Sequence, residues 1–131
     1  MYKQVEGEFS KTEMGWEIYP KGLYDMLKKL HQRYGLPLYI TENGMAGPDK
    51  LINNFVNDYY RIDYLEKHFQ QALLAIKDGV KLKGYFIWTL MDNFEWGEGY
   101  SKRFGLVYVD YETQKRYLKK SALWLKEFLS K

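Results

Sequence analysis

Two stretches of this chain are apolar at nearly every position, and each is short enough to form a single strand. The first covers residues 36–41 (LPLYIT) and the second covers residues 82–90 (LKGYFIWTL). A strand with one solvated face alternates apolar and polar residues, whereas a strand covered on both faces does not. We therefore predict two buried strands of a parallel sheet.

Helical spacing of apolar residues predicts three helices around these strands. The first helix should lie between Pro20, which suits a first turn, and Gly35, which suits a stop. The second should begin near Asp58 and end at Gly79. The apolar stripes of the second and last helices are Ile62, Leu65, Phe69, Leu73, Ile76 and Leu118, Ala122, Leu125, Leu129.

The order strand, helix, strand predicts a βαβ unit, whose crossover should be right-handed. Residues 43–57 and 91–103 should be loops that leave the two strands. Residues 105–110 should be extended and residues 111–115 should form a turn or hairpin. We expect residues 115–120 to be the solvated face of the last helix.

The composition is that of one ordinary globular domain with many aromatic residues. The chain has 131 residues, of which 46% are hydrophobic, 28% charged and 18% aromatic. The net charge of +3 is spread evenly, so we expect no nucleic-acid partner. Without cysteine there is no disulfide and no thiolate metal site.

Other function classes receive no support from the sequence. No window approaches about 18 uninterrupted apolar residues, so we expect no membrane partner. The start MYKQVEGEFS has no apolar signal-peptide core, and we expect a cytoplasmic protein. Neither His31 nor His68 has a second ligand at i+4, so we expect no metal. Gly97 and Gly99 lack the third glycine of a phosphate loop, and we expect no cofactor.

Candidate chemistry gathers where the two strands end. Glu42 follows the first strand, Trp88 lies near the end of the second, and Asp92, Glu95 and Trp96 follow in the next loop. The carboxyl ends of parallel strands meet at one edge, where sites collect. Carboxylates beside aromatic rings suit a sugar, because its ring face stacks and its hydroxyls bond to the acids. The alternatives are that Glu42 caps a surface turn and that Trp88 belongs to the core.

The same motifs resemble a known family. The runs MGWEIYPKGLYDML, YITENG and GYFIWTLMDNFEWGEGYSKRFGLVYVD resemble the retaining β-glycosidases of glycoside hydrolase family 1, chiefly β-glucosidases. The resemblance spans essentially all of the chain and matches the C-terminal end of that family. It implies an α/β fold that is the C-terminal part of a (β/α)8 TIM barrel. Residues 36–41 would be its seventh strand and residues 82–90 its eighth, giving about two βα units plus a preceding and a terminal helix.

The resemblance also implies a role for each of five residues. Glu42 would be the catalytic nucleophile, which forms a covalent glycosyl-enzyme. Trp88 would be the platform under the sugar, and Glu95 would bind its 4- and 6-hydroxyls. The Trp96 indole would donate to another hydroxyl, and Phe104 would lie beside the 6-hydroxymethyl group.

Glu95 indicates the substrate class. The phosphosugar members of the family resemble this stretch but carry Ser in place of Glu95 and Tyr in place of Phe104. A sugar 6-phosphate carries roughly −1.5 to −2 charges, which a carboxylate would repel, and Lys102 alone would not overcome that. We therefore predict non-phosphorylated β-glucosides, with galactosides and fucosides left open. Asn43 is given a turn role only.

The chain departs from the family in lacking a second catalytic carboxylate. Retaining glycosidases use two, about 5–5.5 Å apart. In the family the second lies in an N-E-P motif, which this sequence does not contain. A barrel needs roughly 250 residues, so we expect this chain to be inactive alone and to need the missing N-terminal barrel portion or to self-associate. The alternative is a non-catalytic carbohydrate-binding or assembly module derived from such a barrel.

Overall fold

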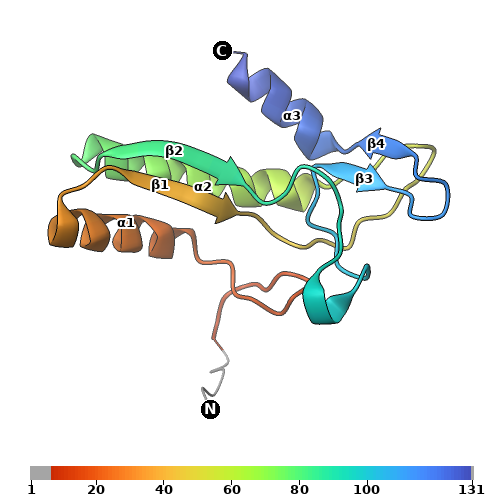
Figure 1. Ribbon diagram of the computed structural model, residues 1–131, viewed down its shortest axis with the longest axis horizontal. Coiled ribbons are helices and arrows are strands. Elements are labelled where there is room, and N and C mark those ends of the chain that lie inside the picture. The colour runs from red at the N-terminus through yellow and green to blue at the C-terminus, as the bar shows by residue number, and fades with distance from the viewer. Residues whose placement is uncertain (1–6, 131) are drawn as a thin grey trace.

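The computed structural model describes residues 7–130 and contains one parallel strand pair flanked by helices (Figure 1). Helix α1 (Pro20–Tyr34) precedes strand β1 (Leu38–Asn43), and helix α2 (Tyr59–Lys77) connects β1 to strand β2 (Leu82–Ile87). Strands β3 (Val107–Val109) and β4 (Arg116–Leu118) precede helix α3 (Lys120–Leu129). A 3-10 turn, η1 (Trp96–Glu98), lies in the loop after β2.

Strands β1 and β2 pair in parallel with α2 as their connection, so the βαβ prediction is confirmed. Helix α1 has the bounds that Pro20 and Gly35 predicted, and Gly35 adopts a φ of 65° that favours glycine. Helix α2 also lies between its predicted limits, Asp58 and Gly79. Local apolar spacing was enough to locate both helices.

Both strand predictions need a correction of their bounds. The first strand was expected at residues 36–41 but lies two residues later, at Leu38–Asn43. Pro37 has no N–H to donate, and the ladder continues to Asn43, whose carbonyl accepts the Trp88 N–H. The second strand was expected to reach residue 90 but ends at Ile87. Beyond it the chain turns away to pair with another segment, because the Thr89 N–H donates to the Phe104 carbonyl.

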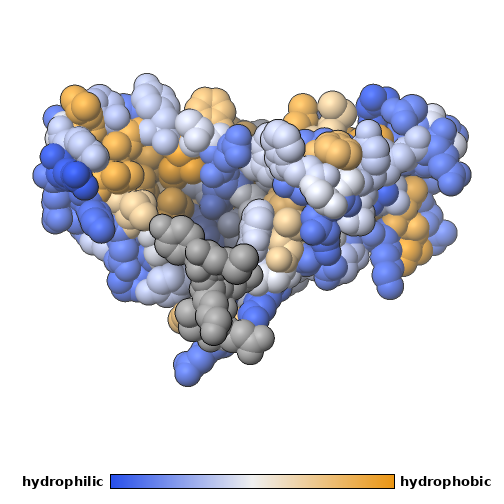
Figure 2. Space-filling view, turned by 60° about the horizontal axis from the view of Figure 1, so that its bottom comes forward, coloured by the Kyte–Doolittle hydropathy of each residue, from blue (hydrophilic) through white to orange (hydrophobic). Residues whose placement is uncertain are grey.

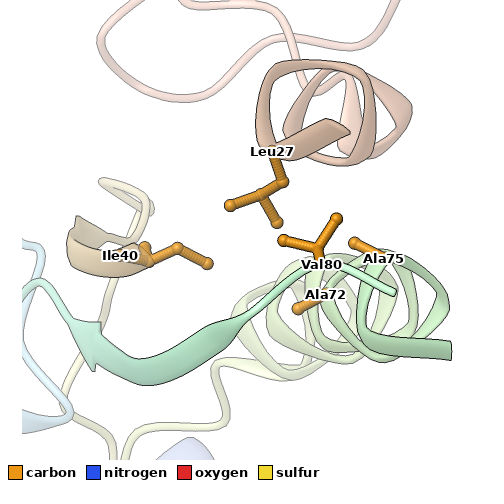
Figure 3. Close-up of a cluster of buried hydrophobic side chains, with 5 residues drawn as sticks. All are labelled: Leu27, Ile40, Ala72, Ala75 and Val80. Carbon is orange, nitrogen blue, oxygen red and sulfur yellow. The ribbon is translucent and has the colours of Figure 1, made fainter. Parts of the chain in front are cut away.

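One face of the strand pair is packed against helices. Figure 3 shows Leu27 of α1 directed toward Ile40 of β1 and Val80, with Ala72 and Ala75 of α2 beside them. These five side chains form a buried apolar cluster. A second cluster, built on Met45, Tyr64, Leu65 and Leu106, connects α2 to α3 and the loops beyond the strands.

The opposite face of the strand pair is exposed in the part of the chain that the structure describes. Tyr39 and Phe86 are 59% and 58% exposed there, although the sequence pattern predicted strands covered on both faces. The apolar residues are present as predicted, but residues 7–130 do not supply a second covering layer. Apolar residues are also exposed in separate patches on the face drawn in Figure 2.

Strands β3 and β4 form an antiparallel hairpin beyond the end of β2. The extended segment and the turn were predicted, but Leu118 was assigned to the last helix and instead ends β4. Helix α3 starts two residues later, at Lys120. No helix among residues 7–130 is long and apolar enough to cross a membrane.

Candidate active site

Glu42 is the penultimate residue of β1 and is exposed to solvent. The strand register changes immediately before it, since Ile40 pairs with Tyr85 whereas Asn43 pairs with Ile87. Strand β1 therefore contains one residue more than β2 over this interval, which is a β-bulge. A bulge interrupts the alternation of side chains and can redirect one of them.

The effect of the bulge is visible in the burial of the residues on either side. Leu38 and Ile40 pack against the helices, and Tyr39 lies on the exposed face. Strict alternation would turn Glu42 toward the helices with Ile40. Instead Thr41 and Glu42 are both exposed and Asn43 is half-buried. The extra residue thus keeps the Glu42 carboxylate on the exposed face, and Glu42 does not occupy the surface turn that was the alternative prediction.

Trp88 directly follows β2 and is joined to the end of β1. Its backbone N–H donates to the Asn43 carbonyl over 3.0 Å. A Cβ atom on Gly44 would lie 1.6 Å from the Trp88 carbonyl oxygen, so only glycine permits this approach of the two backbones. Trp88 is two residues beyond the exposed Phe86 and is itself half-buried. The structure therefore brings Glu42 and Trp88 to the same edge of the strand pair.

Glu95 and Trp96 lie in a loop whose two ends both return to this edge. Met91 pairs with Val107, and Thr89 is hydrogen-bonded to Phe104. Within the loop the Glu95 N–H donates to the Gly99 carbonyl over 2.7 Å, which fixes the backbone around η1. Glu95 is half-buried, whereas Trp96 is 84% exposed. Their contacts with a sugar stay predictions.

Phe104 is nearly completely buried, with 2% of its surface exposed. Its ring packs near Trp16, with 6.1 Å between the ring centroids. The residue thus anchors the returning end of the loop, and its ring offers little surface to a ligand. The predicted contact with a sugar hydroxymethyl group is untested by this geometry.

Six charged residues that sequence reasoning did not connect lie together behind this edge. Their side chains are buried except that of Arg103, which is 17% exposed. They contribute three carboxylates and three cations, so their formal charges cancel. The members of this ion cluster are Asp49, Asp58, Arg61, Asp92, Arg103 and Lys119.

Lys119 lies at the centre of the ion cluster and joins the loops that follow the two strands. Its Nζ atom contacts Asp49 in the loop after β1 and Asp92 Oδ1, at 2.7 Å, in the loop after β2. Asp92 also accepts hydrogen bonds from Arg103 Nη1 over 2.6 Å and from the Gly105 N–H over 2.9 Å. Asp92 was considered as part of the sugar site, but its carboxylate is occupied by these partners.

Arg61 extends the ion cluster to the helices. Its guanidinium donates to Asp49, to Asp58 and to the Arg103 carbonyl, the last over 2.9 Å. Asp58 in turn accepts the Ser121 N–H over 2.8 Å at the start of α3. The ion cluster therefore fixes both loops of the site to the first turns of α2 and α3.

Burial and neighbouring charges act in opposite directions on the two buried cations. Burial lowers the pKa of the Lys119 ammonium and the nearby Arg61 charge adds to this, against the attraction of Asp49 and Asp92. Burial would also lower the pKa of Arg61, but Asp49 and Asp58 outweigh it and the pKa is raised. The prediction that residues 115–120 are the solvated face of the last helix is wrong, because residues 116–118 form β4 and Lys119 is buried. The partners of Lys119 are 70 and 27 residues away in sequence, so local spacing could not indicate them.

Comparison with known proteins identifies a family. A family model described as "Glycosyl hydrolase family 1" matches residues 1–131. The chain is 58% identical over 122 residues to "Beta-glucosidase A" of Thermotoga maritima, an alignment that covers 92% of this chain and 27% of that protein. It is 52% identical over 119 residues to the "6-phospho-beta-galactosidase" of Streptococcus mutans, covering 89% of this chain and 25% of that one.

A solved structure gives the same picture of the fold. The family 1 β-glucosidase of Thermotoga maritima in complex with isofagomine lactam superposes with a TM-score of 0.94 at 55% identity, over 96% of this chain and 29% of that chain. The chain thus spans between a quarter and a third of the length of these relatives.

Proposed function

The chain belongs to glycosyl hydrolase family 1, and from this membership we propose that it provides the nucleophile and part of the sugar site of a retaining β-glucosidase. The observation that carries the proposal is the exposure of Glu42, which the bulge in β1 keeps away from the helices at the edge that also holds Trp88. An ionised carboxylate at that position suits attack on an anomeric carbon.

The first step of the proposed reaction forms a bond between a Glu42 oxygen and the anomeric carbon. The glycosidic C–O bond breaks, and its electron pair leaves on the oxygen of the leaving group, which must gain a proton. A second carboxyl group supplies that proton and later removes one from the water that releases the sugar. The step therefore balances only when a second acid lies about 5–5.5 Å from Glu42.

Two acids in the segments that follow β2, Asp92 and Asp110, are unsuited to this second role. A general acid needs a raised pKa to hold its proton near neutral pH. The Asp92 carboxylate is bound by Lys119 and Arg103. Hydrogen bonds from the Thr113 side chain and backbone lower the pKa of Asp110. We therefore propose that the second acid comes from outside this chain and that the chain alone does not turn over substrate.

An apolar groove supports the proposal that a further barrel portion completes the site. The groove has a volume of about 550 Å³ and runs between α2, β2 and α3. Strand β2 is paired on one side by β1, and its other edge faces this groove in the described residues. A strand edge beside exposed apolar side chains is a docking surface for another strand. The apolar residues that line the groove include Phe69, Leu73, Ile76, Leu90, Phe128 and Leu129.

The proposed substrates are β-glucosides without phosphate. A carboxylate at Glu95 would repel a sugar 6-phosphate. Lys102 was the cation considered for a phosphate, and its Nζ atom donates to the Glu13 carbonyl over 2.7 Å. The name of the Streptococcus mutans relative specifies a 6-phosphosugar, so the test compares a glucoside with its 6-phosphate.

The proposal is tested by co-expressing the chain with the portion of Thermotoga maritima β-glucosidase A that the chain does not match. The purified mixture is assayed with an aryl β-glucoside and with its 6-phosphate. We expect turnover of the unphosphorylated glucoside, and Glu42→Gln should reduce kcat by about 10³-fold or more, as loss of a catalytic nucleophile does.

The matched control is Glu112→Gln, which makes the same chemical change at an exposed position in the hairpin turn and should leave turnover intact. Undiminished turnover by Glu42→Gln would refute the proposed role of Glu42. Faster turnover of the 6-phosphate would refute the proposed substrate class. Measurable glucose binding by the chain alone would favour the binding-module alternative.

A further inference from the structure

Asn43, the last residue of β1, is held by two tyrosine hydroxyls. Its Nδ2 atom donates to the Tyr64 hydroxyl over 3.3 Å, and its Oδ1 atom accepts the Tyr85 hydroxyl proton over 2.5 Å. Tyr64 lies on α2 and Tyr85 on β2. Asn43 was predicted to have only a turn role. It lies instead within β1, and both its Nδ2 and its Oδ1 atoms are hydrogen-bonded.

The bulge directs Asn43 and Glu42 to opposite faces of the strand pair. Asn43 is half-buried and its partner Tyr64 belongs to the buried cluster between α2 and the loops, whereas Glu42 is exposed. The two residues share a peptide unit, so a rotation of the Asn43 backbone moves the Glu42 side chain. Fixing the Asn43 amide against α2 and β2 therefore limits how the Glu42 carboxylate can turn.

The two tyrosines are themselves firmly placed. Tyr64 is 9% exposed and its ring stacks on the His68 ring, with 3.9 Å between the centroids. The Tyr85 ring packs edge-on against Phe69, with 4.9 Å between the centroids. Burial raises the pKa of both hydroxyls, so each keeps its proton at neutral pH. Both tyrosine hydroxyls can therefore keep their hydrogen bonds to Asn43 at neutral pH.

We propose that Asn43, held between Tyr64 and Tyr85, is a positioning residue that aims the Glu42 carboxylate at the sugar. The proposal rests on the proposed function for the role of Glu42, but the geometry of the anchor is independent of it. The backbone of Asn43 contributes as well, because its carbonyl accepts the Trp88 N–H. One residue thus fixes both the acid and the neighbouring indole-bearing segment.

The test uses Tyr85→Phe and Asn43→Ala in the co-expressed mixture. Both variants should lower kcat about 10- to 100-fold, because misplacing a catalytic group by about 1 Å costs this order, and should change KM less than twofold. The matched control is Tyr24→Phe, which also loses one tyrosine hydrogen bond, to Asp78 over 2.6 Å, between α1 and the residue after α2. It should leave kcat unchanged.

Hydrogen exchange, followed by mass spectrometry in the same mixture, gives a readout that does not depend on turnover. Peptides covering residues 38–46 should exchange faster in Tyr85→Phe than in wild type or Tyr24→Phe, with peptides of α1 unaffected. If Asn43→Ala does not fold, Tyr85→Phe alone decides the outcome.

The outcomes separate the two proposals. If Glu42→Gln abolishes turnover but Tyr85→Phe behaves like Tyr24→Phe in kcat, the positioning role is refuted and the proposed function stands. If the mixture shows no turnover that depends on Glu42, the proposed function fails. Hydrogen exchange in residues 38–46 then tests whether Tyr85 holds Asn43 in place. Unchanged exchange in Tyr85→Phe refutes this.

Discussion

At the residue scale, single positions set the geometry of the proposed site. Gly44 lets the backbones of β1 and of the segment after β2 approach closely, which places Glu42 and Trp88 at the same edge. Glu42 remains exposed because β1 contains one residue more than β2 between Ile40 and Asn43. Neither effect requires a strong interaction, because each is set by the steric limits and the path of the backbone.

Gly44→Ala should separate these two segments. Its Cβ would lie 1.6 Å from a backbone oxygen of Trp88, which cannot rotate away. We expect a loss of about 3 kcal/mol in the free energy of unfolding, as for severe overpacking, measured by urea denaturation. Gly97→Ala is the matched control, because a Cβ at Gly97 meets no atom within 4 Å and should leave stability nearly unchanged. Equal stabilities of the two variants would contradict the close approach described here.

At the scale of elements, the helices and the parallel strand pair follow from local sequence. The apolar spacing over α1 and α2 and the continuous apolar runs of β1 and β2 each lie within one segment, and the structure confirms them. The βαβ order also placed Glu42 and Trp88 at one edge before any contact was known. Pattern and chain order were sufficient because each feature depends on neighbours in the sequence.

The remaining features depend on partners far away in the sequence, which is why the sequence did not indicate them. Lys119 looks like one of several exposed cations until Asp49 and Asp92 are brought to it. The bulge at Thr41 and Glu42 exists only relative to β2. The packing of Phe104 near Trp16 likewise joins residues far apart in the sequence.

The ion cluster should be essential to the arrangement of elements around the site. Lys119→Met leaves Asp49 and Asp92 buried without their shared cation, and breaking such a pair costs about 3–5 kcal/mol. We expect a loss of this size in the free energy of unfolding, measured by urea denaturation. Lys21→Met, which removes an exposed i,i+4 pair with Asp25, should leave the free energy of unfolding nearly unchanged. A Lys119→Met protein as stable as Lys21→Met would show that the ion cluster does not hold the loops.

At the scale of the whole molecule, the chain has apolar surfaces that residues 7–130 do not cover. Tyr39 and Phe86 are exposed on one face of the strand pair, and the groove beside β2 is bordered by Leu73 and Ile76, which are 60% and 45% exposed. The sequence predicted strands covered on both faces because residues 36–41 and 82–90 are apolar at nearly every position. We propose that the barrel portion outside this chain covers them.

Leu73→Glu should weaken the docking of that portion without unfolding the chain. The side chain is already 60% exposed, so its replacement removes little buried surface, but a carboxylate in the groove opposes an apolar partner. We expect at least a tenfold drop in the amount of barrel portion co-purified with the chain. Leu123→Glu, at an exposed position of α3 outside the groove, is the control. Equal recovery with both variants would place the docking surface elsewhere.

The single additional residue in β1 has a consequence for how such a protein can change. Deleting Thr41 would remove the bulge, and in the regular strand Glu42 would follow Ile40 directly and still face outward, while Asn43 would still face inward. The bulge therefore absorbs one additional residue while the acid and the amide keep their faces of the strand pair. A coding sequence can thus gain or lose three nucleotides at this point without turning the acid inward.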